Sequence, residues 1–310
     1  MIIGVDNGNC QTKTTHHVFV SGLTQHSVRP PLADEVIEYN GAFWTRSNGR
    51  LPYRRDKTQD EYCFVLTLFA MMAELKERSA LFPVSSADVT LAVGLPPQHY
   101  GALRERFAAY FTQRSPAVFK YNGKQVVITL NQVLVYPQAY AAVVSQATRV
   151  KEYSRLFVVD IGGYTTDVLL LSNGLPDLTF CHSLEIGTIT MANQIRQKVN
   201  SLHDMTIELE HIQDVLADRQ TVLPKDVKDM IATDVASHAA FTMDKLREIK
   251  VDLRANPSIF LGGGAIMLRP FLEQSRMISQ TSFLTDPSAN ALGYEMLAAA
   301  QLRQMPRNGG

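Results

Sequence analysis

Two short segments of the chain combine an aspartate with glycines at the end of an apolar run. Asp6 opens the segment "DNGN" after "MIIGV", and Asp160 opens the segment "DIGG" after "RLFVV". In each case the apolar residues predict a strand and a second strand-like run follows, so both segments predict the turn of a β-hairpin. Glycine in such a turn permits positive φ and lets successive N–H groups face one anion. The two hairpins therefore predict binding sites for phosphate groups.

The polar side chains of these hairpins favour a polyphosphate that is bound together with a metal ion. A Walker A sequence is absent from the chain, so the phosphates would be held in another way. A bare carboxylate beside a polyphosphate is repelled, and we therefore expect Asp6 and Asp160 to act on Mg²⁺ and its water shell. We expect Asp167 to brace its hairpin. Further donors are Thr12 and Lys13 in the first hairpin and Thr165 and Thr166 in the second.

A third glycine run, "LGGGA" at residues 261–265, follows a predicted strand and opens a predicted helix. It carries no acid. Gly262, Gly263 and Gly264 suit a close approach of the backbone to a flat or sugar-like part of a ligand. A tight turn from strand to helix explains the same three residues, and both interpretations stay open at this point.

Hydrophobic periodicity predicts the elements that position these turns. Apolar residues at helical spacing predict a helix over residues 60–78, with acids at its start and bases at its end. Asn122-Gly123 predicts a hairpin. The segment "PQAYAAVVSQA" predicts a helix with Pro137 in its first turn. Residues 188–256 are typical of helices.

The strand and glycine pattern restarts after residue 150, which predicts two α/β domains at residues 1–150 and 151–310. A loop-rich stretch at about residues 24–88 predicts a small subdomain inserted in the first domain and anchored by Trp44. The helical stretch at about residues 188–256 predicts a corresponding subdomain in the second domain.

Composition limits the partners of the chain. Lys plus Arg and Asp plus Glu number 30 each, so no net charge attracts the protein to DNA or to an anionic membrane. The three cysteines are far apart without a CxxC spacing, which argues against a zinc site and a disulfide framework. With no apolar run of about 18 residues, we expect a cytoplasmic protein without membrane contact. The basic run at residues 52–57 is expected to be a solvated surface, and residues 305–310 are expected to fray.

The order of these motifs resembles the superfamily of actin, sugar kinases and heat-shock ATPases. The chain carries "DNGN" with Lys13 after a strand, then "YPQA", "DIGGYTTD", "LGGGA" and finally "ANALGY". The segments "LAVGLPPQHY", "VLVYPQA" and "FLGGGAIML" are similar to the ParM/StbA branch of bacterial actin-like proteins. The resemblance spans essentially the whole chain. It implies an α/β fold of the actin-like ATPase type, with two ribonuclease-H-like domains around a nucleotide cleft and a smaller subdomain on each.

The resemblance also implies roles for single residues in binding Mg²⁺ and ATP, with GTP left open. Asp160, together with Asp6, would hold the metal through water. The glycines 262–264 would approach the α-phosphate and the adenosine, Glu208 would reach the ribose, and "ANALGY" would connect the two halves at a hinge. The first phosphate loop would comprise Asp6, Asn7, Gly8, Asn9, Thr12 and Lys13, and the second Asp160, Gly162, Gly163, Tyr164 and Thr165.

Gln138 completes the expected catalytic set with Asp6 and Asp160. It stands where some relatives carry glutamate, and actin itself has glutamine. A glutamine does not accept a proton as a carboxylate does, so its expected role is to orient the attacking water, as in small GTPases. Slow hydrolysis would follow, which suits a filament that uses its nucleotide as a timer.

The resemblance implies an ATPase that polymerises into filaments on binding ATP and segregates plasmid or mobile-element DNA. The filament would contact DNA only indirectly, through a ParR-like DNA-binding adaptor. Two alternatives stay open. A sugar or acid kinase of the same fold would need an aspartate base near the position of Gln138, and a chaperone or reactivating ATPase would act on a protein client.

Overall fold

The computed structural model describes residues 1–52, 56–79, 82 and 84–304. These residues form two compact units, each with its own hydrophobic core. Unit 1 comprises Met1–Ala147 and Asp286–Gly310, and unit 2 comprises Thr148–Thr285. The second domain was predicted to extend to residue 310, whereas in the structure the described residues 286–304 group with unit 1. Residues 53–55 of the predicted basic run and the predicted frayed end at 305–310 lie outside the described residues.

Unit 1 is built on one nine-stranded sheet in the order β3-β2-β1-β7-β9-β8-β5-β6-β4. Strands β4 to β6, which lie in the stretch predicted as an inserted subdomain, extend this sheet. The strands are β1 (Ile2–Asn7), β2 (Gln11–Lys13), β3 (Val18–Val20), β4 (Leu23–His26), β5 (Ile37–Tyr39), β6 (Ala42–Arg46), β7 (Ser86–Leu95), β8 (Ala117–Tyr121) and β9 (Lys124–Pro137).

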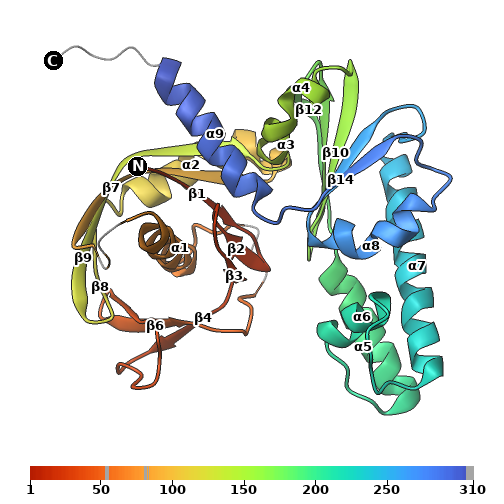
Figure 1. Cartoon of the computed structure of the whole chain (residues 1–310), viewed down its shortest axis with the longest axis horizontal. Helices are drawn as coiled ribbons and strands as arrows, with labels where there is room; N and C mark the ends of the chain where they lie inside the picture. The colour runs from red at the N-terminus through yellow and green to blue at the C-terminus, as the bar shows by residue number, and fades with distance from the viewer. Residues whose placement is uncertain (53–55, 80–81, 83, 305–310) are drawn as a thin grey trace. The chain divides into compact units, whose positions relative to one another are not determined.

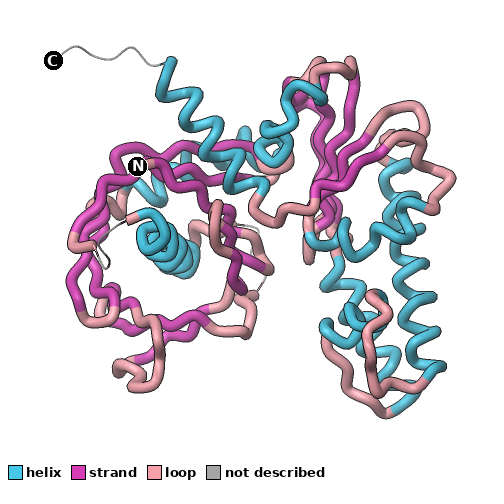
Figure 2. The backbone as a smooth tube through the Cα atoms, in the orientation of Figure 1, coloured by secondary structure: helices cyan, strands magenta, loops and turns pink. Residues whose placement is uncertain are grey.

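The sheet of unit 1 curves around helix α1 (Tyr62–Arg78), which Figure 2 shows inside a ring of strands. The whole run from Cys63 to Met72 is buried. A helix that is apolar on all sides belongs in a core, and here the curved sheet supplies apolar neighbours around it. Trp44 of β6 is fully buried, and its ring lies 5.4 Å from that of Tyr62 at the start of the helix.

Two local predictions in unit 1 have different outcomes. The hairpin at Asn122-Gly123 is confirmed, with φ of 50° and 83° at its two turn residues. The helix predicted to include Pro137 in its first turn is wrong in its start, because Pro137 pairs with Leu95 as the last residue of β9.

The remaining helices of unit 1 are α2 (Pro97–Thr112), α3 (Tyr140–Val143), the 3₁₀ turn η1 (Val144–Gln146) and α9 (Ala289–Gln304), and α4 (Ala147–Val150) leads into unit 2.

Unit 2 contains a five-stranded sheet in the order β12-β11-β10-β13-β14. The helical stretch predicted at residues 188–256 is observed as α5, α6 and α7. The strands of unit 2 are β10 (Arg155–Ile161), β11 (Thr166–Ser172), β12 (Leu175–Leu184), β13 (Ser258–Leu261) and β14 (Thr281–Leu284). Its helices are α5 (Thr188–His203), α6 (Leu209–Leu216), α7 (Lys225–Glu248) and α8 (Gly263–Glu273).

The two sheets share one topology. In unit 1, β1 forms an antiparallel hairpin with β2, which pairs with β3, and on its other side β1 runs parallel to β7 and then β9. In unit 2, β10 forms the same hairpin with β11 and β12, and runs parallel to β13 and then β14. The predicted α/β fold with a repeated core is therefore confirmed. No helix in the described part of the chain has the length and hydrophobicity needed to span a membrane.

Candidate functional site

Asp6 and Gln138 meet at one edge of the unit 1 sheet. The parallel strands β1, β7 and β9 end there, with Leu95 opposite Pro137 in the register. Gln138 Nε2 donates a hydrogen bond of 2.9 Å to Asp6 Oδ1. The carboxyl ends of parallel strands are where α/β proteins place ligands, because chain reversals there expose backbone and side chains to a common space. Two predicted site residues that are 132 positions apart are thus brought together.

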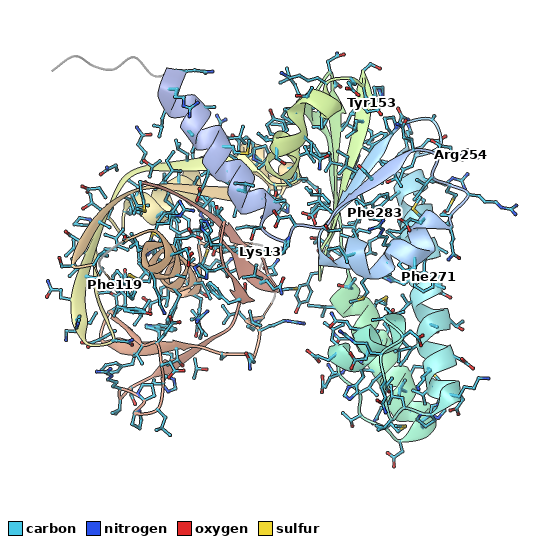
Figure 3. All side chains as sticks on the ribbon, viewed as in Figure 1. Lys13, Phe119, Tyr153, Arg254, Phe271 and Phe283 are labelled. Atoms are coloured by element: carbon cyan, nitrogen blue, oxygen red, sulfur yellow. The ribbon has the colours of Figure 1, made fainter. Side chains whose placement is uncertain are left out.

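The contact with Asp6 fixes the orientation of the Gln138 amide. An ionised carboxylate only accepts hydrogen bonds, so the amide must turn its NH₂ group toward Asp6. Its Oε1 then faces the other way and is available to accept a hydrogen bond. Asp6 is buried, and Lys13 Nζ lies 4.0 Å from its second oxygen, since the two residues are opposite each other in the hairpin. Figure 3 shows Lys13 on this hairpin of unit 1.

The turn of the first hairpin directs backbone N–H groups outward. Its carbonyl groups are held from behind, because Ser21 Oγ donates 2.7 Å to Gly8 O and the Lys57 ammonium donates to Asn7 O. In a trans peptide the carbonyl and the following N–H point in opposite directions. The N–H groups of Gly8 and Asn9 therefore face away from these partners. Such a pair of N–H groups is a ready site for a phosphate oxygen.

Two residues of the first loop help to shape the turn. A Cβ on Gly8 would lie 2.6 Å from Gln11 O, so the tightness of the turn explains this glycine. Thr12 is completely buried, and its hydroxyl lies 2.9 Å from Ser21 Oγ. The hydroxyl of Thr12 is thus engaged in the interior, and its role as a phosphate donor stays a prediction.

Gln138 is followed by a strained turn. Ala139 has φ of 62° and ψ of −49°, and Tyr140 N donates 2.6 Å to Gln138 O. This is the rarer form of γ-turn, which a residue with a side chain adopts at a cost of about 1–3 kcal/mol. Strain of this kind persists only where the surroundings impose it, and Ala139 N donates 3.1 Å to Asn290 Oδ1 on α9.

In unit 2, Asp160 occupies the position that corresponds to Asp6. It is the next-to-last residue of β10, opposite Asp167 in the hairpin and beside Leu261 in the parallel pair with β13. Gly262, the next residue, has φ of +89°. A Cβ at this position would lie 2.4 Å from Asp160 Oδ1, so the carboxylate needs the glycine in order to lie against this backbone.

The turn of the second hairpin repeats the arrangement of the first. Gly162 O accepts a bond of 3.1 Å from Thr188 N, and Gly163 O accepts one of 2.7 Å from Ile189 N, both at the start of α5. By the same geometry of the peptide unit, the N–H groups of Gly163 and Tyr164 face away from α5. Each unit therefore presents an acid-bearing strand end with outward N–H groups.

The third glycine run, residues 262–264, fits both interpretations that the sequence left open, a tight turn from strand to helix and a close approach of the backbone to a ligand. A Cβ on Gly264 would lie 2.6 Å from Ile161 Cγ2, so packing within unit 2 explains Gly264 as it explains Gly262. Gly263 has nothing within 4 Å of where its Cβ would be. It begins α8, whose first N–H groups have no partner within the helix and favour an anion. Gly263 is therefore the member of the run that can approach a ligand.

Hydroxyls near Asp160 mostly serve the hairpin itself. Thr165 Oγ1 donates 3.0 Å to Asp167 Oδ2, which agrees with the bracing role expected for Asp167. Thr166 is buried and donates 2.6 Å to Ile186 O, so its hydroxyl is engaged within the protein. Glu208 precedes α6 and pairs with Arg196 at 3.0 Å. Its contact with a ribose stays a prediction.

The carboxylates fit a magnesium ion that is held largely by water and phosphate. In the described residues, no three His, Cys, Asp or Glu side chains gather into a metal-binding cluster. Mg²⁺ bound to a nucleotide needs only one or two carboxylates, because phosphate oxygens and waters fill its other positions. The oxygens of Asp6 already face Gln138 and Lys13, which suits a contact through water.

Comparisons with known proteins agree on one family. The family model "Actin like proteins N terminal domain" matches residues 4–140, and "Archaeal actin homologue MreB-like, C-terminal" matches residues 158–274. The chain belongs to the actin-like proteins. The predicted resemblance is confirmed, because the two models together span both hairpins and the third glycine run. No curated protein sequence matches this actin-like protein.

Solved structures of other actin-like proteins share its fold. The archaeal actin homologue Ta0583 has a TM-score of 0.79 and 16% identity, covering 97% of this chain and 99% of its own. A ParM from a 15-stranded filament of Clostridium botulinum has a TM-score of 0.74 and 17% identity, covering 96% and 99%. ParM of Bacillus thuringiensis, solved with ATP, has a TM-score of 0.68 and 12% identity, covering 97% and 99%. Ta0583 has also been solved with ADP.

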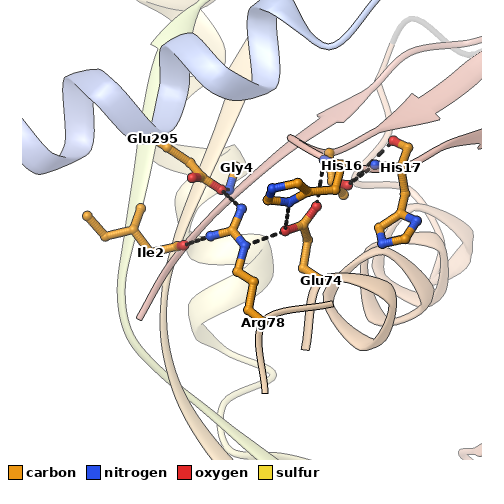
Figure 4. A network of polar contacts seen from close by, with 8 residues as sticks. Ile2, Gly4, His16, His17, Glu74, Arg78 and Glu295 are labelled. Carbon is orange, nitrogen blue, oxygen red and sulfur yellow. Dashed lines mark hydrogen bonds and ion pairs between the residues drawn. The ribbon is translucent and has the colours of Figure 1, made fainter. Parts of the chain in front are cut away.

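A network of charges behind the first hairpin of this actin-like protein was not predicted (Figure 4). Glu74 of α1 is completely buried and accepts bonds from the backbone N–H and from Nδ1 of His16, both at 2.9 Å. Arg78 lies 2.5 Å from Glu74 and 2.7 Å from Glu295 of α9. Glu295 also accepts 2.9 Å from Gly4 N in β1. The network thus ties β1 and the end of its hairpin to two helices.

Other residues around the site were missed because their roles depend on distant partners. Lys57 belongs to the basic run that was expected to be solvated, yet it bonds to the first phosphate loop. Ser21 and Asn290 are ordinary polar residues in the sequence. The one available signal was the position of Asn290 within "ANALGY", which the sequence analysis linked to a hinge and not to Gln138.

Proposed function

We propose that this actin-like protein is an ATPase whose hairpins bind the phosphates of a nucleoside triphosphate with Mg²⁺. The observation that carries the proposal is the repetition of one arrangement in both units. Asp6 and Asp160 each lie next to last on the strand that opens the hairpin, and each turn directs N–H groups outward. ATP is the proposed substrate by analogy with relatives that have been solved with ADP and with ATP.

Gln138 would orient the attacking water. Its NH₂ group is held by Asp6, so Oε1 can accept a hydrogen bond from the water and align the water with the terminal phosphate. Lys13 and the outward N–H groups would neutralise charge on the phosphates. Bound Mg²⁺ would supply further charge neutralisation, with Asp6 and Asp160 holding its water shell. Glutamine is not a general base, and slow hydrolysis is the expected result.

We further propose that the protein assembles into filaments with itself when ATP binds. The similar structures include a ParM filament and nucleotide complexes of two relatives, which support this assignment by likeness of fold. The cellular task that fits a ParM-like actin is segregation of plasmid or mobile-element DNA in the cytoplasm. With equal numbers of basic and acidic residues, the filament would reach DNA through a ParR-like adaptor.

Assembly is the decisive measurement. Light scattering and sedimentation of the purified protein are expected to rise on adding Mg²⁺ and ATP above a threshold protein concentration, and to fall as nucleotide is hydrolysed. Electron microscopy of the same samples should show filaments only with nucleotide. Absence of any increase over micromolar protein concentrations would reject the filament proposal. Nucleotide consumption that depends on an added sugar or acid would indicate a kinase instead.

A second experiment tests the role of Gln138. The variant Gln138→Ala is expected to bind nucleotide and assemble like the parent protein but to release phosphate at least about tenfold more slowly, since water is no longer oriented. Phosphate release and light scattering are recorded on the same sample. Gln301→Ala, a glutamine on α9 that bonds to Tyr136, is the matched control. Hydrolysis by Gln138→Ala at the parental rate would show that Gln138 has no such role.

A further inference from the structure

The backbone N–H that follows Gln138 is bonded to a side chain and not to the sheet. Strand β9 ends at Pro137, so the sheet offers no acceptor to Ala139. Ala139 is completely buried, and a buried N–H without a partner is strongly disfavoured. The acceptor is Asn290 Oδ1 at 3.1 Å. Asn290 is itself buried, at 6% exposure.

Helix α9 fixes the position of this acceptor through close contacts between backbones. A Cβ on Gly4 would lie 2.1 Å from Ala291 O, and a Cβ on Gly293 would lie 1.9 Å from Ala141 O. At such distances neither helix nor strand can shift toward the other. Asn290 lies on the same turn of α9 as Ala291 and Gly293, so its oxygen is held in place relative to the end of β9.

We propose that Asn290 is a positioning residue that acts through Gln138. By accepting the Ala139 N–H, it maintains the strained γ-turn, and the γ-turn in turn sets the direction in which the Gln138 side chain leaves the backbone toward Asp6. Without the acceptor, the turn relaxes to an unstrained conformation and the Gln138 amide loses its fixed contact with Asp6. The consequence for hydrolysis rests on the proposed ATPase function, whereas the effect on the Gln138 amide does not.

The first test needs no nucleotide. The full-length protein is labelled with ¹⁵N at glutamine, and the side-chain NH₂ signals of Gln138 are identified by their loss in Gln138→Ala. In Asn290→Ala these signals are expected to shift or broaden. In Asn290→Asp, which keeps an oxygen acceptor, they stay close to their parental positions. Gln301→Ala removes a different bond between α9 and β9, at Tyr136, and is expected to leave them unchanged.

Signals of Gln138 that are identical in Asn290→Ala and the parent protein would overturn the proposal. If Asn290→Ala is poorly folded by circular dichroism, Asn290→Leu fills a similar volume without an acceptor and is judged by the same criterion. A change in Gln301→Ala as large as that in Asn290→Ala would also count against it, because general loosening of α9 would then explain both.

The second test measures phosphate release. Asn290→Ala is expected to slow release at saturating ATP by a factor similar to that of Gln138→Ala, with nucleotide affinity changed less than twofold. The double variant should be no slower than Gln138→Ala alone, since residues that act through one another are not additive. Multiplying effects in the double variant would contradict the proposal. A parent protein that hydrolyses no ATP would reject the proposed function, and the NMR measurement would still decide the role of Asn290.

Discussion

Glu74 is a buried carboxylate that holds the first hairpin to its neighbours. Burial alone would raise the pKa of its carboxyl, but hydrogen bonds from Thr14 and His16 and the charge of Arg78 together lower the pKa below its ordinary value of 4.5. A pKa that is lower in the folded protein adds stability above the pKa of the unfolded chain, and this stability is lost as the pH falls through the folded value. Glu74 therefore stabilises unit 1 at neutral pH.

We expect Glu74→Gln to lower the stability of unit 1 by about 3 kcal/mol at pH 7, because the charge of Arg78 loses a buried partner. The difference from the parent protein should shrink as the pH falls below 4.5, because the Glu74 carboxyl of the unfolded chain is then protonated at a higher pH than that of the folded protein. Urea unfolding followed by fluorescence measures unit 1 selectively, since Trp44 is the single tryptophan of the chain.

The exposed neighbour Glu77 on the same helix provides the control for this experiment. Glu77→Gln is expected to change stability by less than about 0.5 kcal/mol at either pH. An effect of Glu74→Gln that stays constant between pH 7 and pH 3 would contradict the assigned pKa shift.

At the scale of residues, the sequence predicts those positions whose chemistry is local. Asp6, Asp160 and the turn glycines stand out because an acid and a glycine come together at the end of an apolar run in both halves. Lys57 and Glu74 do not, since each acts on a hairpin that is about 50 residues away or more and no local pattern marks the pair.

Helix α9 packs closely against the rest of unit 1 through small residues and one aromatic ring. Gly293 allows its backbone to touch that of α3, and Gly94 leaves room for Tyr294, whose hydroxyl would lie 1.9 Å from a Cβ at residue 94. Tyr294 also stacks on Tyr136 of β9 at 6.4 Å between ring centroids. The helix thus contacts the strands whose ends carry Asp6 and Gln138.

Gly293→Ala is expected to destabilise unit 1 by about 1–3 kcal/mol, because the added methyl group would overlap a backbone oxygen that cannot move away. Gly101→Ala in α2 is the matched control. Nothing lies within 4 Å of its Cβ position, so this change should stabilise the helix by about 0.5–1 kcal/mol. Both effects are measured by urea unfolding with Trp44 fluorescence, and equal effects of the two substitutions would show that α9 is not closely packed.

At the scale of elements, periodicity located α1 and the helices of unit 2, and the Asn-Gly pair located its hairpin. The start of the helix predicted over "PQAYAAVVSQA" was misjudged, because strand pairing with β7 extends to Pro137 and a γ-turn follows before α3 begins at Tyr140. Pairing with a distant strand overrides local preference, and such pairing is not visible in a local pattern.

The repeated topology of the two sheets has a consequence for the stability of the whole molecule. If the hairpins bind nucleotide, saturating nucleotide should raise the unfolding temperature, with about 2.7 kcal/mol gained at a hundredfold excess over the dissociation constant. We expect Asp6→Ala and Asp160→Ala each to abolish this shift, relative to its own ligand-free value. Thermal unfolding with and without Mg-ATP measures the shift.

The control variant is Asp177→Ala, which changes a carboxylate of β12 in the same unit as Asp160. It should keep the full rise in unfolding temperature on adding Mg-ATP. A shift that survives in Asp6→Ala and is lost only in Asp160→Ala would assign nucleotide binding to unit 2 alone.

At the scale of the molecule, the sequence predicts the duplication because both halves repeat a strand, a glycine turn and a strand. It does not predict that α9 returns to unit 1. That outcome depends on close contacts at Gly4, Gly94 and Gly293. The sequence shows that these residues are glycines, but it does not show which atoms occupy the space where a side chain would be.

The return of α9 also sets an order of events during synthesis. Unit 2 is one continuous stretch, Thr148–Thr285, and can acquire its core as soon as that stretch has left the ribosome. Unit 1 is begun first and finished last, since the acceptors for the N–H groups of Gly4 and Ala139 arrive only with residues 290 and 295. A nascent chain therefore carries an amino-terminal unit whose β1 and β9 ends lack these two acceptors until α9 has left the ribosome.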